Sequence, residues 1–416
     1  MSPLWVIVSI VLVDLLGFSI VMPLLPRFAK EYGFNELQIG LLLAAYPMLQ
    51  LLAGPILGRL SDRYGRRPLL VISQAGTALS FLVLGLSRNF TVMLLARLLD
   101  GASGGNILVA QAYVADVTKP EHRARSLGLI GAAFGIGFVV GPLLGGLLIE
   151  MPLSKDWQLR LPFLVAAGFS TAAWLLVVFR LPESLPIGAQ ARQAARVVSW
   201  RGVVKTISDP KIGVLVAVGF LVVLAFAALE GTFSLFLRER MGWGADRAAY
   251  GFAFLGFVSA IVQGGLIRRL VPLFGEPKLI VTGIAALAIG LAALGFSQSW
   301  PLLMVAILVV GIGQGLASPT IQGLLSRSTP ASDQGAVFGT LASAQTLARM
   351  SNYLAANLLF GRGGPSLPFW EGSVIAGIAL VLAVVGIGSR AASGETMPDG
   401  AAFTAKTTVP PSDAQV

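Results

Sequence analysis

Long apolar stretches recur along almost the whole chain of 416 residues. A helix that crosses a lipid bilayer needs about 20 mostly apolar residues, and the sequence supplies twelve such stretches. They lie at about 4–26, 37–58, 68–87, 90–115, 124–149, 161–181, 211–237, 247–267, 277–296, 301–326, 334–360 and 369–389. This pattern predicts an all-α membrane protein with twelve transmembrane helices.

The composition excludes several other classes of protein. Hydrophobic residues make up 55% and charged residues only 12% of the chain, about half the charged share of an ordinary soluble protein. The chain has no cysteine and only one histidine, His122, so neither a disulfide framework nor a multi-histidine metal site is expected. The net charge of +10 fits basic cytoplasmic loops. We therefore expect a lipid bilayer as partner, and neither nucleic acid nor a bound metal.

The basic residues also predict the topology, because cytoplasmic loops carry an excess of lysine and arginine. With the N-terminus inside, 19 basic residues fall in inner segments and 9 in outer ones. Both termini are thus predicted to be cytoplasmic, in the inner (plasma) membrane. The predicted organisation is an N-terminal six-helix half (1–181), a polar cytoplasmic linker (182–210), a C-terminal six-helix half (211–389) and a disordered cytoplasmic tail (390–416).

Two loops share a pattern at an offset of 210 residues, half the length of the chain. GPILGRLSDRYGRRPLL (54–70) aligns with GGLIRRLVPLFGEPKLI (264–280), so that Gly65 matches Gly275. The same offset places Gly101 on Gly311. Chance matching in a glycine-rich chain is the alternative. A duplicated six-helix unit with a site between the copies is a transporter architecture, and the pattern favours it.

Charged residues inside the apolar stretches are the strongest functional signal, because each is costly in a bilayer. Asp14 lies near the middle of the first stretch. Burial favours the neutral form of a carboxyl group, so Asp14 is predicted to carry a proton; a structural hydrogen bond is the alternative. Arg97 and Asp100 are three residues apart on the fourth helix and can neutralise each other. The partner of Arg349 in the eleventh stretch is left open.

Glu230 lies between Phe226 and Phe233 at helical spacing in the seventh stretch. A carboxylate beside aromatic rings suits a lipophilic cation, so these residues form a predicted substrate site; a solvated Glu230 near the outer surface is the alternative. Polar amides in other stretches are further candidates, although most such amides bond between helices. They are Asn106, Gln111, Gln263, Gln314 and Gln345.

The sequence resembles the major facilitator superfamily. The loop GRLSDRYGRR between the second and third stretches is similar to the loop signature of that family, and GIGFVVGPLLGG in the fifth stretch is similar to the motif of its drug:proton antiporters. AQAYVADVT (110–118) resembles the tetracycline-resistance exporters in particular. The loop residues are Gly58, Asp62, Arg63, Gly65, Arg66 and Arg67, and the antiporter residues are Gly137, Gly141, Pro142, Gly145 and Gly146.

Each motif has a physical interpretation. Asp62 among the loop arginines can form ion pairs that hold one conformation shut and open in another; a topology signal alone is the alternative. The glycines of the fifth stretch recur every four residues and allow a close helix contact. We expect this contact to seal the two halves against leak; ordinary packing of small residues is the alternative. The resemblance makes Arg97, with Asp100, a candidate for proton coupling.

We therefore expect a proton-coupled exporter of small hydrophobic or amphipathic compounds that works by alternating access as a monomer. Tetracycline-type drugs are one candidate substrate class, and a broader or different set of drugs is the alternative. No nucleotide-binding GxxxxGK[ST] loop is present, so the proton gradient replaces a cofactor. A sugar or organic-acid transporter on the same fold is the alternative, and a membrane receptor that lacks transport is a third possibility. No enzymatic activity is expected.

Overall fold

The structure is a computed structural model that describes residues 2–185, 206–330 and 333–392. These residues form helices and no strand. Residues 186–205 of the predicted linker and 393–416 of the predicted tail lie outside the described part. The helices of the first half are α1 (Pro3–Glu31), α2 (Glu36–Tyr64), α3 (Arg66–Leu86), α4 (Phe90–Ser103), α5 (Asn106–Val117), η1 (Pro120–His122), α6 (Arg123–Ile149) and α7 (Lys155–Arg180).

The second half repeats this order of long helices. Its helices are α9 (Pro210–Met241), α10 (Ala245–Ile261), the π-helical turn η2 (Val262–Leu266), α11 (Ile267–Phe274), α12 (Glu276–Phe296), α13 (Trp300–Arg327), α14 (Gln334–Gly363) and α15 (Leu367–Ala392). With α4–α5 and α10–α11 each counted as one interrupted span, the described residues match the twelve predicted stretches one to one.

Eleven of these segments are long and apolar enough to cross a membrane. The remaining one is α14, which carries Gln345, Arg349, Asn352 and Asn357 along its length. Several helices run past their predicted ends: α1 continues to Glu31. A helix of 29 residues is roughly 43 Å long at about 1.5 Å per residue, whereas the hydrocarbon core is about 30 Å thick. The ends can therefore be polar.

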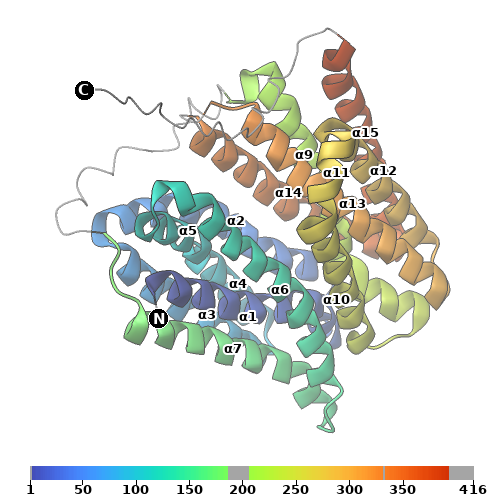
Figure 1. Cartoon of the computed structure of the whole chain (residues 1–416). Coiled ribbons are helices and arrows are strands. Elements are labelled where there is room, and N and C mark those ends of the chain that lie inside the picture. Colours follow the sequence, from blue (N-terminus) through green and yellow to red (C-terminus); the bar gives the residue numbers. More distant parts are fainter. Residues whose placement is uncertain (1, 186–205, 331–332, 393–416) are drawn as a thin grey trace, which may run out of the picture.

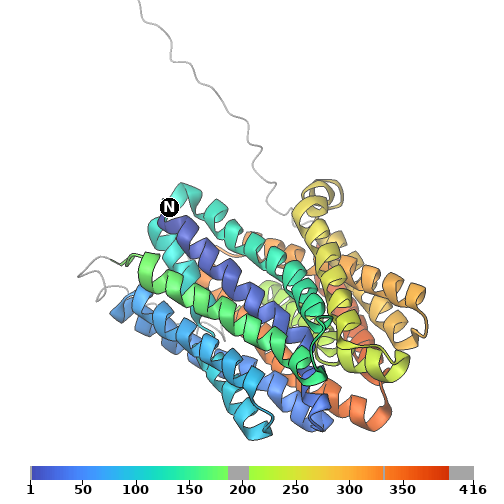
Figure 2. The ribbon, with the colours of Figure 1, turned by 90° about the horizontal axis from the view of Figure 1, so that it is seen from below.

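The packing of the helices follows the predicted repeat. In the first half α1 packs on α6 and α7, and α3 packs on α4 and α7. In the second half α9 packs on α14 and α15, and α12 packs on α13 and α15. The contacts between halves are reciprocal, since α6 packs on α10 and α14 packs on α2. Figures 1 and 2 show α1–α7 (blue to green) beside α9–α15 (light green to red), as expected for two pseudo-repeats.

Consecutive helices run in opposite directions, so their ends gather at two sides of the molecule. We call the side that holds the turn at Gly65, between α2 and α3, the Gly65 end. The opposite side, where α1 finishes, is called the Glu31 end.

Candidate functional site

A cavity of about 310 Å³ lies between the two halves. Helices α1 to α6 of the first half line it together with α9 and α14 of the second. Its wall is largely apolar and aromatic, with Phe18, Phe81, Phe134 and Phe138 among the lining side chains. Five charged residues also line it: Asp14, Arg97, Asp100, Glu230 and Arg349. An apolar pocket with a few convergent polar groups is the usual form of a small-molecule site.

The halves are held together at the Glu31 end. Arg238 of α9 reaches Glu31 of α1 across the interface, with 3.6 Å between Nη2 and Oε1. Gly40 of α2 lies directly against the backbone of α14 at Tyr353. At the Gly65 end, by contrast, the ion pairs that Arg66 and Glu276 form in the described residues stay within one half each. The cavity is therefore closed toward the Glu31 end.

Asp14 lines this cavity and is only 7% exposed. Asn106 Nδ2 donates to Asp14 Oδ2 at 2.6 Å and to Gln74 Oε1 at 3.0 Å. The second carboxylate oxygen, Oδ1, is buried without a hydrogen-bond partner. A buried carboxylate with an unsatisfied oxygen is costly, whereas a protonated carboxyl group gains a donor.

A break in the fourth span explains how Asn106 reaches Asp14. The sequence predicts one helix over 90–115, but α4 ends at Ser103 and α5 begins at Asn106. The break brings Asn106, the first residue of α5, and hence the positive end of the α5 dipole, beside Asp14. Interrupted helices of this kind build ion and substrate sites in transporters.

Arg97 and Asp100 pair on α4, as the spacing predicts. Arg97 Nη1 lies 2.8 Å from Asp100 Oδ2, and both side chains are almost fully buried. Arg97 also donates from Nε to the carbonyl oxygen of Leu42 at 3.2 Å and lies over the ring of Tyr46, 5.0 Å from its centroid. Its charge and its orientation are therefore fixed by the first half alone.

Glu230 has a cationic partner that the sequence analysis left unassigned. Arg349 Nε donates to Glu230 Oε2 at 3.3 Å, and the hydroxyl of Tyr353 donates to the same oxygen at 2.9 Å. Glu230 is 6% exposed, so the solvated position considered for it is wrong. Because Arg349 already balances its charge, Glu230 does not present a free carboxylate to a ligand.

The two aromatic neighbours of Glu230, Phe226 and Phe233, do not line the cavity. Phe233 is 2% exposed and packs edge-on against Phe252, with 5.3 Å between the ring centroids. Phe226 packs against the main apolar core. Helix α9 is buried on nearly all sides, so helical spacing alone did not identify the face that lines the cavity.

Of the five predicted amide contacts, the structure brings only Asn106 to this cavity. Gln111 and Gln263 are exposed, whereas Gln314 and Gln345 are partly buried away from the lining. Residues that the sequence analysis did not assign to the site include Gln74, which bonds Asn106, and Tyr353, which bonds Glu230. Each is recognisable only once its partner from another helix is known.

The predicted antiporter glycines divide between two contacts. Gly137, Gly141 and Gly145 lie against α1, in the same half, and Ser19 Oγ of α1 donates to the carbonyl oxygen of Gly137 at 2.8 Å. Only Gly146 lies against the second half, at the ring of Tyr250 on α10. These three glycines therefore join α6 to α1 within the first half. They do not form the expected contact between the two halves.

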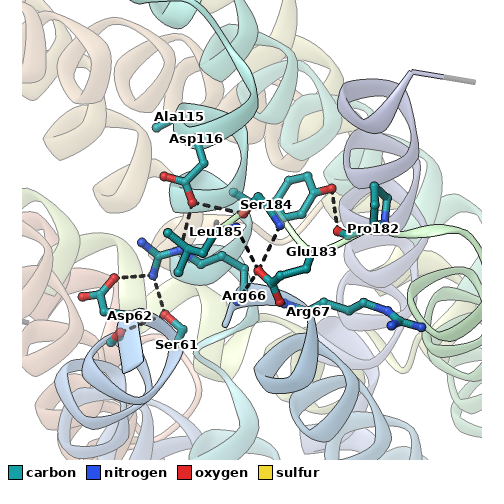
Figure 3. A network of polar contacts seen from close by, with 12 residues as sticks. Ser61, Asp62, Arg66, Arg67, Ala115, Asp116, Pro182, Glu183, Ser184 and Leu185 are labelled. Atoms are coloured by element: carbon teal, nitrogen blue, oxygen red, sulfur yellow. Dashed lines mark hydrogen bonds and ion pairs between the residues drawn. The ribbon is translucent and has the colours of Figure 1, made fainter. Parts of the chain in front are cut away.

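The predicted gating loop forms an ion-pair network at the Gly65 end (Figure 3). Arg66 Nη1 lies 2.5 Å from Asp62 Oδ1, and Arg66 Nε lies 3.1 Å from Asp116 Oδ2 at the end of α5. Glu183, just after α7, accepts hydrogen bonds from the backbone N–H groups of Arg66 and Arg67 at 2.9 and 3.0 Å. A carboxylate there satisfies the free N–H groups and the dipole of α3.

The remaining loop residues lie at the edge of this network. Gly65 adopts φ 106°, a conformation that favours glycine, and Arg63 lies over the ring of Tyr64. Gly58 accepts a hydrogen bond at its carbonyl from Ser61 Oγ at 2.8 Å. Asp116 and Glu183 were not predicted, because they lie 50 and 117 residues from Arg66 in sequence.

Within residues 2–185, 206–330 and 333–392, no three His, Cys, Asp or Glu side chains lie close enough together to hold a metal ion.

A central cavity between two similar six-helix halves that meet at one end is the architecture of a secondary transporter.

Comparisons with known proteins identify the family. The model described as Major Facilitator Superfamily matches residues 7–274 and 266–406. The tetracycline resistance protein, class C, of Escherichia coli is 32% identical over 392 residues, which cover 92% of this chain and 95% of that protein. The class B protein of Escherichia coli is 30% identical over 381 residues and covers 90% and 92%.

A solved structure gives the same result. The crystal structure of the human organic anion transporter MFSD10 (TETRAN) matches with a TM-score of 0.69 and 26% identity, over 91% of this chain and 98% of that one. The chain belongs to the major facilitator superfamily. It is a transporter and not an enzyme, and the predicted resemblance to tetracycline-resistance proteins is confirmed.

Proposed function

We propose that this transporter exports small hydrophobic or amphipathic compounds in exchange for protons, by alternating access of the central cavity. The observation that carries the proposal is Asp14, a buried carboxylate in the cavity wall with one oxygen unpartnered. A carboxylate in this state favours proton uptake. The apolar, aromatic lining supports a lipophilic substrate, and the tetracycline resistance proteins among its relatives support export of drugs.

The proposed cycle uses only groups within one chain, so the protein acts as a monomer and needs no cofactor besides the proton gradient. Arg97 and Asp100 hold a fixed ion pair near Asp14 in the same wall, and we assign to them a supporting role in proton coupling. The contacts at the Glu31 end break when the halves rock to the opposite state. The ion pairs at the Gly65 end lie within one half each, so they do not have to break in this step.

The test of proton exchange uses everted membrane vesicles from an efflux-deficient host, with a fluorescent dye that reports internal acidification. A drug panel that includes tetracycline is added, and each transported compound releases protons from the vesicles. We expect Asp14→Asn to abolish this release while the protein remains inserted and monodisperse, because asparagine keeps the hydrogen bonds of the site but carries no proton.

The matched control is Asp156→Asn, which makes the same change at an exposed ion pair with Arg88 at the Glu31 end. Normal proton release by Asp14→Asn would make Asp14 structural and reject the exchange mechanism. Uptake of sugars or organic acids into right-side-out vesicles, without drug export, would favour the metabolite transporter instead.

We further propose that the Gly65 end faces the cytoplasm of the inner membrane, on the basis of the lysine and arginine distribution. The natural chain has no cysteine, so single cysteines can be labelled without background. Arg63→Cys should react with a membrane-impermeant maleimide only in everted vesicles, and Lys155→Cys only in intact cells. The reverse pattern would invert the topology.

A further inference from the structure

The cavity presents one guanidinium group whose hydrogen-bonding capacity is largely unused. The side chain of Arg349 is 37% exposed, whereas that of its partner Glu230 is 6% exposed. Only Nε of Arg349 donates to Glu230, at 3.3 Å. Among the described residues, none accepts a hydrogen bond from its two terminal nitrogens. An arginine has five N–H donors, so most of this fork remains available to a ligand.

The other arginine of the cavity differs in this respect. Arg97 is 5% exposed, donates to Asp100 and to the backbone of Leu42, and stacks on Tyr46. Asp100 neutralises its charge, its Nε and Nη1 already donate to protein groups, and little of the side chain is exposed. Arg349 is therefore the cation of this site that a substrate can reach.

The acidic residues of the cavity wall are, in contrast, paired or buried. Asp100 pairs with Arg97, and Glu230 accepts bonds from both Arg349 and Tyr353. Asp14 bonds Asn106 through one oxygen, and its other oxygen is buried. No acid in the described lining offers an exposed, unpaired carboxylate to a cation.

From these contacts we infer that the transporter recognises its substrate by an anionic group, bound by Arg349. The inference rests on the proposed transport function and specifies its substrate class: amphipathic aryl carboxylates. A guanidinium fork matches a carboxylate with two parallel hydrogen bonds. The apolar part of such a compound fits the lining formed by Phe18 and Phe138, whose rings lie 6.4 Å apart.

Glu230 then opposes substrate binding. Its carboxylate competes with the substrate for the positive charge of Arg349, and it also fixes the position of the guanidinium through Nε. Removal of the Glu230 charge should strengthen the binding of an anion. This is the reverse of the result expected from the sequence, where Glu230 was predicted to attract a cation.

The experiment measures binding to the purified full-length protein in nanodiscs of neutral lipid, without a proton gradient. The probes are biphenyl-4-carboxylate, its primary amide and biphenyl-4-methylamine, which share one apolar body and differ in charge. Affinities come from isothermal titration calorimetry. For the wild-type protein we expect the carboxylate to bind at least about tenfold more tightly than the amide or the amine, as for the loss of a charged hydrogen bond.

Two variants test the assignment to Arg349. Arg349→Gln should lose the preference for the carboxylate, but it leaves a buried Glu230 without its partner and can unfold. The double variant Glu230→Gln with Arg349→Gln removes both charges and keeps the approximate volume, and it should lose the preference as well. Glu230→Gln alone should bind the carboxylate several-fold more tightly. Arg362→Gln, at the exposed end of the same helix, is the matched control and should change nothing.

Three results would overturn the inference. They are an amine that binds more tightly than the carboxylate and is weakened by Glu230→Gln, a carboxylate affinity unchanged in the double variant, and no carboxylate binding to the wild-type protein. Because no gradient is present, these results are independent of proton coupling. A carboxylate preference without Asp14-dependent proton release would retain the anion site and reject the exchange mechanism.

Discussion

The two turns at the Gly65 end share a backbone conformation and differ in charge. Gly65, between α2 and α3, has φ 106° and ψ 155°, and Gly275, between α11 and α12, has φ 76° and ψ 156°. Arginine follows the first glycine and glutamate follows the second. Arg66 pairs with Asp116 at the end of α5, whereas Glu276 pairs with Arg327 at the end of α13.

The repeat has thus kept the position of an ion pair while it exchanged the two charges. The surroundings have diverged further. In the first copy Asp62, Ser61 and Glu183 surround the pair. In the second copy Pro272 occupies the position of Asp62, and α11 has no buried residue. The difference shows that one turn is a connected network and the other an isolated pair, and it predicts unequal responses to equivalent substitutions.

The largest difference is expected between Arg66→Gln and Glu276→Gln. The first variant leaves Asp62 and Asp116, which are 27% and 17% exposed, without their shared partner. Its cost should lie between that of an exposed pair, about 1 kcal/mol, and that of a buried one, about 3–5 kcal/mol. The second leaves Arg327, whose side chain is 59% exposed, and an exposed pair contributes about 0–1 kcal/mol. Thermal unfolding in detergent, followed by intrinsic fluorescence, checks the ranking. Equal losses would show that the two pairs are equivalent.

Alanine at the two glycines should give a smaller but still unequal effect. Each substitution places a side chain at positive φ, which costs about 1–3 kcal/mol. At Gly65 the atom nearest to the new Cβ is Oε2 of Glu183 at 2.5 Å, whereas at Gly275 it is Cδ of Pro277 at 3.8 Å. Gly65→Ala should therefore lower the unfolding temperature more than Gly275→Ala. The opposite order would contradict the contact of Gly65 with Glu183.

Removal of the carboxylate that caps α3 should cost less again. Glu183→Gln weakens the bonds to the backbone N–H groups of Arg66 and Arg67, and a lost cap costs about 1 kcal/mol. Helix α12 begins at Glu276, after the N-cap residue Gly275. Among the described residues, no side chain accepts a hydrogen bond from its first backbone N–H groups, so the second turn folds without such a carboxylate. Glu121→Gln, an exposed acid at the same end, is the control. A transporter whose melting temperature does not change would show that water replaces the cap.

The smallest effect on stability is expected for Asp62→Asn, because Arg66 keeps its contacts with Asp116 and Ser61. Its effect should appear in kinetics instead. A network that biases one state over another changes the rate of exchange without contact to the substrate. Equilibrium binding should stay near the wild-type value while drug exchange slows, as measured in vesicles. Weakened binding with unchanged exchange would reject a gating role.

Most of the fold could be predicted from the sequence. Twelve apolar stretches, each close to the thickness of a bilayer, allow little besides a helical bundle, and the offset between Gly65 and Gly275 indicated the repeat. The break at residues 104–105 was missed, because Gly104 and Gly105 lie within an apolar run and a glycine in a helix is often tolerated.

The candidate site was predicted only in part. The sequence identified Asp14, Arg97 and Asp100 because a charge in an apolar stretch is conspicuous wherever it lies. It did not pair Glu230 with Arg349, which lie 119 residues apart, although both lie in spans of the second half and each charge in a span needs a partner. The sequence analysis did not assign Asp116 and Glu183 to the network, because charges near helix ends are common.

The sequence by itself determined that this chain spans a membrane, that it is built from two similar halves, and that it belongs to a transporter family. These properties follow from the length and period of apolar runs and from local motifs, all of which can be read from neighbouring residues in the sequence. The tertiary structure alone decided which charge the cavity offers to a substrate. That property depends on which groups from distant helices meet, because each charge acts on a ligand only after its partners have been satisfied.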